Sequence, residues 1–214
     1  CQHPGSLDLV VLNGVDTFAA LSSGAYAYAE NYLYTKEAIE DYLRTLRPGG
    51  LLNLNRWFET DGRGPRETLR LFVMVLDALG PDGSGRPWEH VIIGTDTGCG
   101  LTLVKKTPFT PGEQERLLAY FSSHGVTPVY TPFPRPGAAA NEFDGYVSAM
   151  KQEDSKGFID RYWADISVVT DDSPFFYKYY RFRPFQGGSL HPAGGGSVFY
   201  IQFIILLQAG AFTA

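Results

Sequence analysis

The sequence predicts an α/β fold with a mostly parallel sheet that ends in an antiparallel hairpin. An apolar run at residues 7–12, an amphipathic segment and a second apolar run at residues 51–55 follow one another closely. This is the pattern of a strand–helix–strand unit, whose strands are parallel with a right-handed crossover. Two later runs, residues 88–95 and 100–106, are joined by a turn too short for a crossover, so we expect them to pair antiparallel.

The composition indicates one globular domain with a small appendage. Of the 214 residues, 44% are hydrophobic and 19% are charged, which is enough apolar material for a core. The net charge of −5 lacks the basic footprint of a nucleic-acid-binding protein. Cys1, Cys99 and four scattered histidines provide neither a disulfide framework nor the ligand spacing of a metal site. We therefore expect a small-molecule partner, no nucleic acid and no metal.

The first strand–helix–strand unit has a local signal at each of its elements. Residues 7–12 are almost continuously apolar, which is typical of a strand buried on both faces of a parallel sheet. Thr35 can cap a helix whose apolar residues recur at helical spacing from Ile39 to Leu46. The Pro-Gly-Gly sequence at residues 48–50 should end that helix before the second strand.

The remaining elements are predicted in the same way. Pro65 should begin a second helix, because proline is favoured at the first helical position. Thr110 and Glu113 form a capping box that opens a helix to about Ser123, and residues 126–130 suit one more short strand.

The chain divides into four predicted parts. Residues 1–130 form the α/β domain, and residues 131–185 form a helical extension that begins with a Pro- and Ala-rich linker. Residues 186–197 are a Gly-rich tether, and residues 198–214 carry no charge and begin a transmembrane helix. A hydrophobic helix packed on the core is the alternative, but the run has no polar face. Basic residues shortly before the run place the soluble part in the cytoplasm.

Five short sequences together resemble a known family. They are the segments 8–16 (Asp-Leu-Val-Val-Leu-Asn-Gly-Val-Asp), 30–35, 46–52, 100–106 and 170–175 (Thr-Asp-Asp-Ser-Pro-Phe). The chain resembles the C-terminal half of a Rossmann-like class I S-adenosylmethionine-dependent methyltransferase fold. More narrowly, it resembles the spermidine synthase (polyamine aminopropyltransferase) family in its membrane-fused bacterial branch. The resemblance is good over residues 7–106 and loose beyond.

The resemblance implies an activity and a location. The expected activity is transfer of an aminopropyl group from decarboxylated S-adenosylmethionine to an amine, in polyamine biosynthesis, by a protein of the bacterial inner membrane that could form a homodimer. The Gly-rich loop and the acidic residue that bind the cofactor, with the first three strands of the fold, would lie upstream of Cys1. A non-catalytic Rossmann-like sensing or scaffold domain is an alternative, as is a small-molecule methyltransferase that uses S-adenosylmethionine.

The resemblance also assigns catalytic positions. The family carries Asp-x-x-Asp after this strand, and its first Asp takes a proton from the attacking amine. Here the two positions are Asn13 and Asp16. An amide cannot accept that proton, although it can orient the amine by a hydrogen bond. Asp16 would offset the positive charge of the substrate, or alternatively cap a short helix that starts near Thr17.

Four further residues are candidates for substrate binding. Glu30 and Tyr34, together with Tyr32, could line the pocket, and ordinary aromatic packing is the alternative for the tyrosines. Asp171 and Asp172 could bind the far ammonium of a polyamine-like substrate. The alternative is structural, because Asp-Asp-Ser-Pro is a favourable turn sequence.

Overall fold

The computed structural model describes residues 4–14, 29–59, 62–80, 85–96 and 98–180. Three predicted features lie outside these ranges: Asp16 with its loop, the Gly-rich tether and the apolar run 198–214. None of the helices in the described ranges combines the length and apolar character needed to cross a bilayer.

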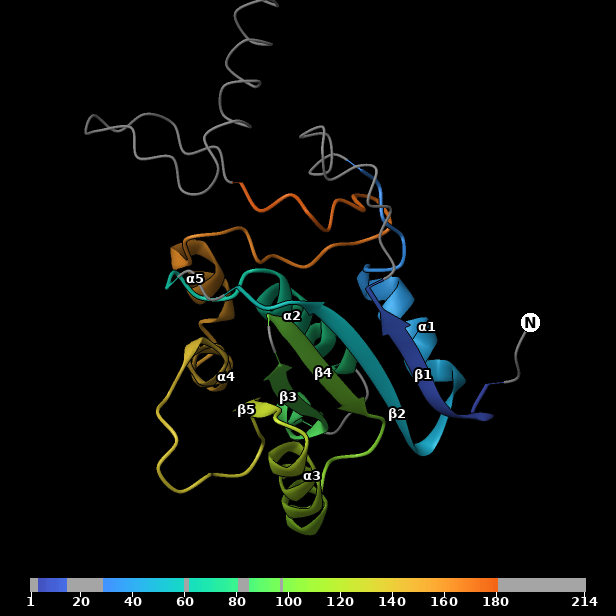
Figure 1. Ribbon diagram of the computed structural model, residues 1–214. Coiled ribbons are helices and arrows are strands. Elements are labelled where there is room, and N and C mark those ends of the chain that lie inside the picture. The colour runs from blue at the N-terminus through green and yellow to red at the C-terminus, as the bar shows by residue number, and fades with distance from the viewer. Residues whose placement is uncertain (1–3, 15–28, 60–61, 81–84, 97, 181–214) are drawn as a thin grey trace, which may run out of the picture.

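A five-stranded sheet forms the centre of the molecule, with strand order β1-β2-β4-β3-β5 (Figure 1). The strands are β1 (Leu7–Asn13), β2 (Leu46–Trp57), β3 (Val91–Asp96), β4 (Cys99–Lys105) and β5 (Thr127–Tyr130). The helices are α1 (Lys36–Thr45), α2 (Glu67–Leu79), the 3-10 helix η4 (Pro87–His90), α3 (Pro111–Ser123), α4 (Glu142–Lys151) and α5 (Ser155–Arg161).

The strand pairing confirms the strand–helix–strand unit and the hairpin. β1 and β2 are parallel with α1 between them, and β3 and β4 form an antiparallel pair joined by a short turn. The prediction of a mostly parallel sheet is wrong for the described residues, because β2–β4 and β3–β5 are also antiparallel. The reason is that β4 lies between β2 and β3 and runs against both, so β1–β2 is the only parallel pair of neighbours among the described strands.

The predicted helix starts hold within two residues. Thr35 caps α1, with its side chain accepting a bond from the Ala38 amide at 3.2 Å, and the capping box of Thr110 and Glu113 opens α3. By contrast, α2 begins at Glu67 rather than at Pro65. The Pro-Gly-Gly segment belongs to β2 instead of forming a separate turn, because the strand begins directly after α1.

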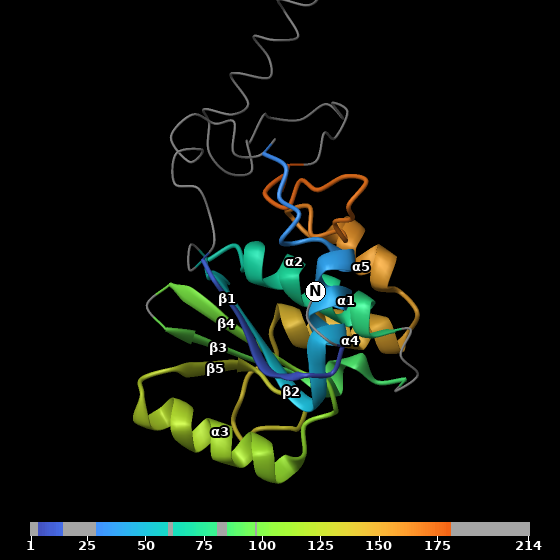
Figure 2. The ribbon, with the colours of Figure 1, turned by 90° about the vertical axis from the view of Figure 1, so that its right-hand side faces the viewer.

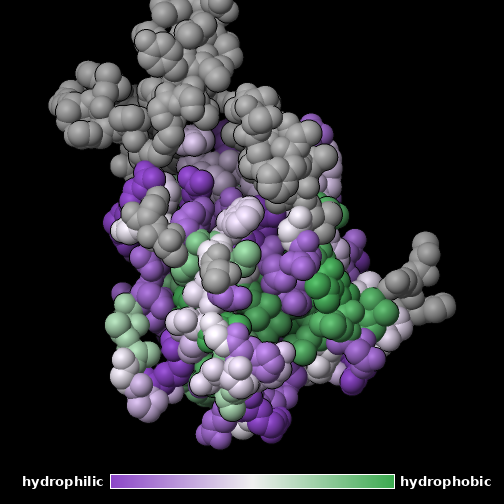
Figure 3. Space-filling model, in the orientation of Figure 1, coloured by the Kyte–Doolittle hydropathy of each residue, from purple (hydrophilic) through white to green (hydrophobic). Residues whose placement is uncertain are grey.

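The two faces of the sheet are covered unequally. α1, α2 and α4 lie on one side of it, and α3 lies apart from them on the other (Figure 2). Over β1 the α3 side is open: Leu9 is 52% exposed and Val11 is 50% exposed, and apolar side chains gather there at the surface (Figure 3). The expectation that β1 is buried on both faces is therefore wrong in this structure, because α3 covers only the other strands.

The helical extension packs into the same core as the sheet. The Phe72 ring of α2 lies 5.3 Å from the Phe143 ring of α4 and 4.9 Å from the Tyr130 ring of β5. Beyond α5, the chain returns across the end of the sheet, and Ile166 and Phe176 are fully buried in the main hydrophobic cluster. This return brings residues near 170 to the amino-terminal end of α1.

Candidate functional site

Two asparagines mark the carboxyl end of the parallel pair. Asn13 and Asn55 are register partners on β1 and β2, and the Asn55 amide donates a hydrogen bond to Asn13 Oδ1 at 3.0 Å. The carboxyl ends of parallel strands are where open α/β sheets bind ligands. A carbonyl oxygen has two lone pairs, so Asn13 Oδ1 keeps one for another donor, such as an ammonium group.

Two distant segments meet above this end of the sheet, and we call them the acidic clasp: residues 29–37 and 169–177. Backbone hydrogen bonds join them, from the Asn31 amide to the Pro174 carbonyl at 2.7 Å and from the Lys36 amide to the Val169 carbonyl at 2.8 Å. The ribbon shows the two segments side by side in both views (Figures 1 and 2). The bonds therefore hold the predicted binding residues of both segments in one place.

The clasp concentrates carboxylates at the surface. They belong to Glu30, Glu37, Asp171 and Asp172. The Glu37 carboxylate accepts a hydrogen bond from the Asp171 amide at 3.0 Å. The ammonium of Lys36 lies 2.8 Å from Asp77 of α2, so this lysine is directed toward α2. The result is a surface of negative charge suited to an organic cation.

Tyr32 lies beside Glu30 in the first segment of the clasp. Its hydroxyl donates a hydrogen bond to Glu30 Oε2 at 3.2 Å. That bond and the Glu30 charge raise the pKa of the Tyr32 phenol, and the charge of Asp171 adds to the effect. Two of the predicted substrate-binding residues, separated widely in sequence, thus act on the same side chain.

Below the clasp lies a buried ion pair that the sequence analysis missed. Arg56 of β2 and Glu67 of α2 have side chains that are 1% and 7% exposed, with Arg56 Nη2 2.7 Å from Glu67 Oε2. Burial raises the pKa of the Glu67 carboxyl, and the Arg56 guanidinium opposes that rise. The alternation of side chains along a strand could have revealed that Arg56 is buried, because Arg56 falls on the same face as the buried Leu52 and Leu54.

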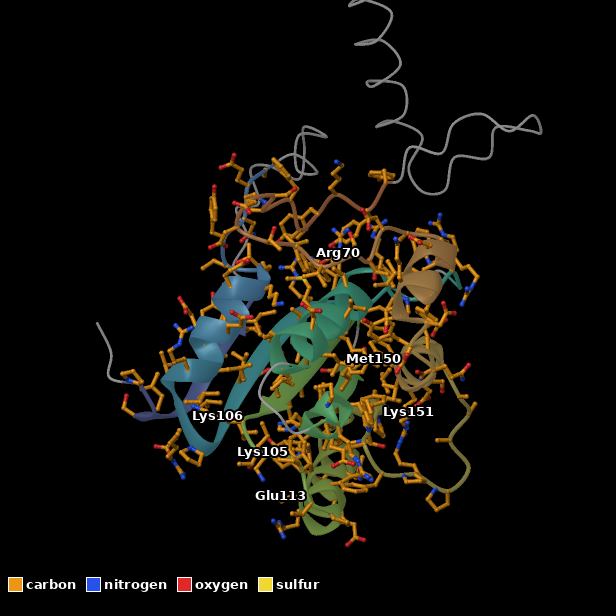
Figure 4. The ribbon with its side chains drawn as sticks, turned by 180° about the vertical axis from the view of Figure 1, so that it is seen from behind. Arg70, Lys105, Lys106, Glu113, Met150 and Lys151 are labelled. Atoms are coloured by element: carbon orange, nitrogen blue, oxygen red, sulfur yellow. The ribbon has the colours of Figure 1, made fainter. Side chains whose placement is uncertain are left out.

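A second buried arginine fixes the chain after α5. Arg70 of α2 donates to the Phe176 carbonyl, lies 3.4 Å from Asp165 and has its Cζ 4.9 Å from the Tyr179 ring centroid. Figure 4 shows Arg70 at the clasp end of the molecule. Two arginines from neighbouring elements therefore hold residues 165–179 against the sheet.

The predicted site residues reach different places. Glu30 and Asp171 come together, and Asp172 is exposed in a turn closed by the Ser173 amide on the Thr170 carbonyl at 3.0 Å. Tyr34 is fully buried against Phe176, with ring centroids 4.9 Å apart, so the packing alternative describes it. Its direct contact with substrate stays a prediction.

No described residue has an assigned role in binding S-adenosylmethionine, and residues 15–28, which follow Gly14, lie outside the described ranges. No cluster of three or more His, Cys, Asp or Glu side chains suitable for a metal occurs among the described residues.

Comparison with known proteins gave one structural similarity. No family model matches the chain, and no curated protein sequence matches it. The crystal structure of a probable spermidine synthase from Corynebacterium glutamicum aligns with a TM-score of 0.41 and 20% identity. The alignment covers 61% of this chain and 43% of that chain, so this chain spans less than half the length of the similar structure. Values this low do not carry residue roles from one protein to the other.

Proposed function

We propose that this chain is the amine-binding part of a spermidine synthase-like transferase. The observation that carries the proposal is the acidic clasp, which gathers carboxylates from residues 29–37 and 169–177 above the carboxyl ends of β1 and β2. A di- or polyamine carries separated positive charges, and carboxylates placed on two segments can bind more than one of them. The family resemblance of residues 7–106 supports the same reaction class.

Each predicted residue has a role in this proposal. Glu30 and Asp171 bind an ammonium near Tyr32, and Asp172 extends the negative surface. Asn13 accepts a hydrogen bond from the reacting amine through the lone pair that Asn55 leaves unused. Asp16, outside the described residues, is proposed to offset the positive charge of the substrate.

Decarboxylated S-adenosylmethionine is the proposed donor. Its sulfonium would supply the propylamine group, and binding the amine in a fixed position relative to it would favour displacement. The described residues of this chain contribute the amine side of that arrangement. We assign no donor contact to any of them.

We further propose that residues 198–214 anchor the protein in a bacterial inner membrane, with the clasp on the cytoplasmic side. The support is the uncharged run itself and the basic residues Lys178, Arg181 and Arg183 that precede it. Membrane fractionation of the chain with and without residues 198–214 tests this. Recovery of both forms in the soluble fraction would exclude an anchor in this run.

A non-catalytic amine sensor is the second candidate, and Asn13 favours it. An asparagine at the position of the expected proton acceptor leaves the β1 tip without a carboxylate. Such a domain would bind the amine through the clasp but would release no product.

Two measurements test the proposed function in order. Titration calorimetry with putrescine and spermidine should show binding that weakens in Glu30→Gln and Asp171→Asn, while Glu115→Gln on α3 serves as a charge-matched control. Absence of binding to the parent chain would reject amine recognition. Release of methylthioadenosine from decarboxylated S-adenosylmethionine and putrescine then distinguishes the transferase from the sensor, because a sensor binds without product.

A further inference from the structure

Arg56 lies beneath the acidic clasp and contacts both of its segments. Its Nη1 lies 3.5 Å from the Tyr34 hydroxyl in the first segment. Its Cζ lies 5.0 Å from the Tyr34 ring centroid and 5.0 Å from that of Tyr177 in the second segment. The Phe176 ring lies 5.7 Å away on the same segment. One side chain of the sheet therefore connects the two segments from below.

Glu67 holds the guanidinium in one orientation. Its Oε2 accepts from Arg56 Nε at 3.1 Å and from Nη2 at 2.7 Å. The guanidinium is planar and its donors have a fixed fork geometry, so binding two of them sets the direction of the third. The edge toward Glu67 is thereby occupied, and Nη1 is directed to Tyr34.

The contacts continue from Arg56 to the surface. Asn31 Nδ2 donates to the Tyr177 hydroxyl at 3.4 Å, and Asn31 lies next to Glu30 in the chain. On the other segment, Phe176 and Tyr177 follow closely on the turn that carries Asp171. A displacement of the buried rings would therefore move both carboxylates.

We propose that Arg56 is a positioning residue of the amine site: by holding Tyr34 and Tyr177 it sets the separation of Glu30 and Asp171. The inference deepens the proposed function, on which its ligand depends, but the structural step can be measured without any ligand. Arg56 itself is buried and touches no amine.

Arg56→Lys separates positioning from simple charge. Lysine keeps the positive charge beside Glu67 but has neither the planar fork nor the flat surface that stacks between the tyrosine rings. The buried ion pair can persist, while the contacts of Arg56 with Tyr34 and Tyr177 are lost. Although this substitution conserves the charge, we expect it to change the relative position of the two clasp segments.

Tyr32 provides the readout. Ultraviolet titration of the phenol, taken as the difference between each background and the same background with Tyr32→Phe, isolates this residue among the 13 tyrosines. The hydrogen bond and charge of Glu30 are the main causes of the raised Tyr32 pKa, and the charge of Asp171 in the other segment adds the smallest part. In Arg56→Lys we expect the Asp171 part to be lost, so that this pKa falls slightly while the Glu30 effect remains, and spermidine affinity to fall with it.

Ile92→Ala is the matched control. Ile92 is fully buried in the cluster with Phe109 and Phe121, away from the clasp, so its loss lowers stability without contact to Arg56. A Tyr32 titration unchanged in Arg56→Lys would overturn the inference, and so would an equal fall in Ile92→Ala. If Arg56→Lys does not fold, Tyr34→Phe removes the hydroxyl near Nη1, and an unchanged titration there overturns it equally.

The two proposals can fail separately. If the parent chain binds no spermidine but Tyr32 still responds to Arg56→Lys alone, the proposed function is wrong and the positioning inference stands. If spermidine binds but the Tyr32 pKa does not change in Arg56→Lys, the proposed function stands and the positioning inference is wrong.

Discussion

Two ion pairs, each between a basic side chain and a glutamate, lie at opposite ends of this molecule, and they differ in burial. Arg56–Glu67 is almost fully buried below the acidic clasp, whereas Lys105–Glu113 lies at the start of α3 with side chains 11% and 30% exposed. Figure 4 shows Lys105 and Glu113 together at the end opposite to Arg70. Both pairs join a strand to the first turn of a helix.

The carboxyl groups of the two pairs respond in opposite directions. Burial is the largest influence on Glu67 and raises its pKa. At Glu113 the hydrogen bond from Lys105, at 2.5 Å, comes first and the bond from the Thr110 amide second, and together they lower the pKa to about 2. The comparison shows that an ion pair has no fixed effect on a carboxyl group: desolvation decides at one end, and hydrogen bonding decides at the other.

Breaking the buried pair should have the largest effect. Arg56→Met leaves Glu67 without its guanidinium in a nearly dry site, and we expect a loss of about 3–5 kcal/mol in the free energy of unfolding. Urea denaturation measures it. The double variant Arg56→Met/Glu67→Leu should recover much of that loss, because no charge is then buried unpaired. A double variant as unstable as the single one would show that packing, rather than the stranded charge, dominates.

The helix cap at the other end should matter less. Thr110 accepts from the Glu113 amide at 3.3 Å and completes the capping box of α3. Thr110→Ala is expected to cost about 1 kcal/mol of stability, measured by the same denaturation. Thr110→Ser keeps the hydroxyl and serves as the control, so equal losses in both variants would argue against a capping effect.

Removing the Lys105–Glu113 ion pair should have a smaller effect still. Lys105→Met eliminates the ammonium that bonds Glu113 but retains an apolar stem of similar length. We expect a loss below about 1 kcal/mol, since partly solvated ion pairs contribute little. A loss as large as that of Arg56→Met would contradict the distinction between the two ends.

The pH dependence of stability should carry opposite signs for the two acids. The pKa of Glu113 is lowered in the folded state. Its contribution to the free energy of unfolding is therefore present above its unfolded pKa of about 4.3 and is lost as the pH falls toward about 2. Glu67 has a raised folded pKa, so its contribution is present at low pH and is lost as the pH rises through that value. The difference in melting temperature between each variant, Glu113→Gln or Glu67→Gln, and the parent should be measured against pH. We expect this difference to change with pH in opposite directions for the two variants. Slopes of the same sign would refute the assignment.

Much of the fold follows from local sequence signals. Apolar runs predicted the strands, Thr35 and the Thr110–Glu113 box predicted two helix starts, and the short turn before β4 predicted the hairpin. The exposure of Leu9 and Val11 could not be predicted, because an apolar run shows that a strand prefers burial but not which neighbours are present to cover it.

The candidate site depended more strongly on tertiary contacts. The sequence identified Glu30 and Asp171 singly, since acidic residues beside turns are visible in any sequence. Their proximity required the chain after α5 to return across the sheet, a long-range arrangement with no local signal. Arg56 was missed because the strand was predicted to end at residue 55, whereas β2 continues to Trp57 and buries the Arg56 side chain.

The sequence by itself therefore determined the elements of this protein and the chemical character of its acidic segments, because helix caps, turns and strand alternation are properties of neighbouring residues. The tertiary structure alone decided that residues 29–37 and 169–177 form one clasp and that a buried arginine supports it. The physical reason is that burial, desolvation and the contacts of a guanidinium depend on which distant segments surround a residue.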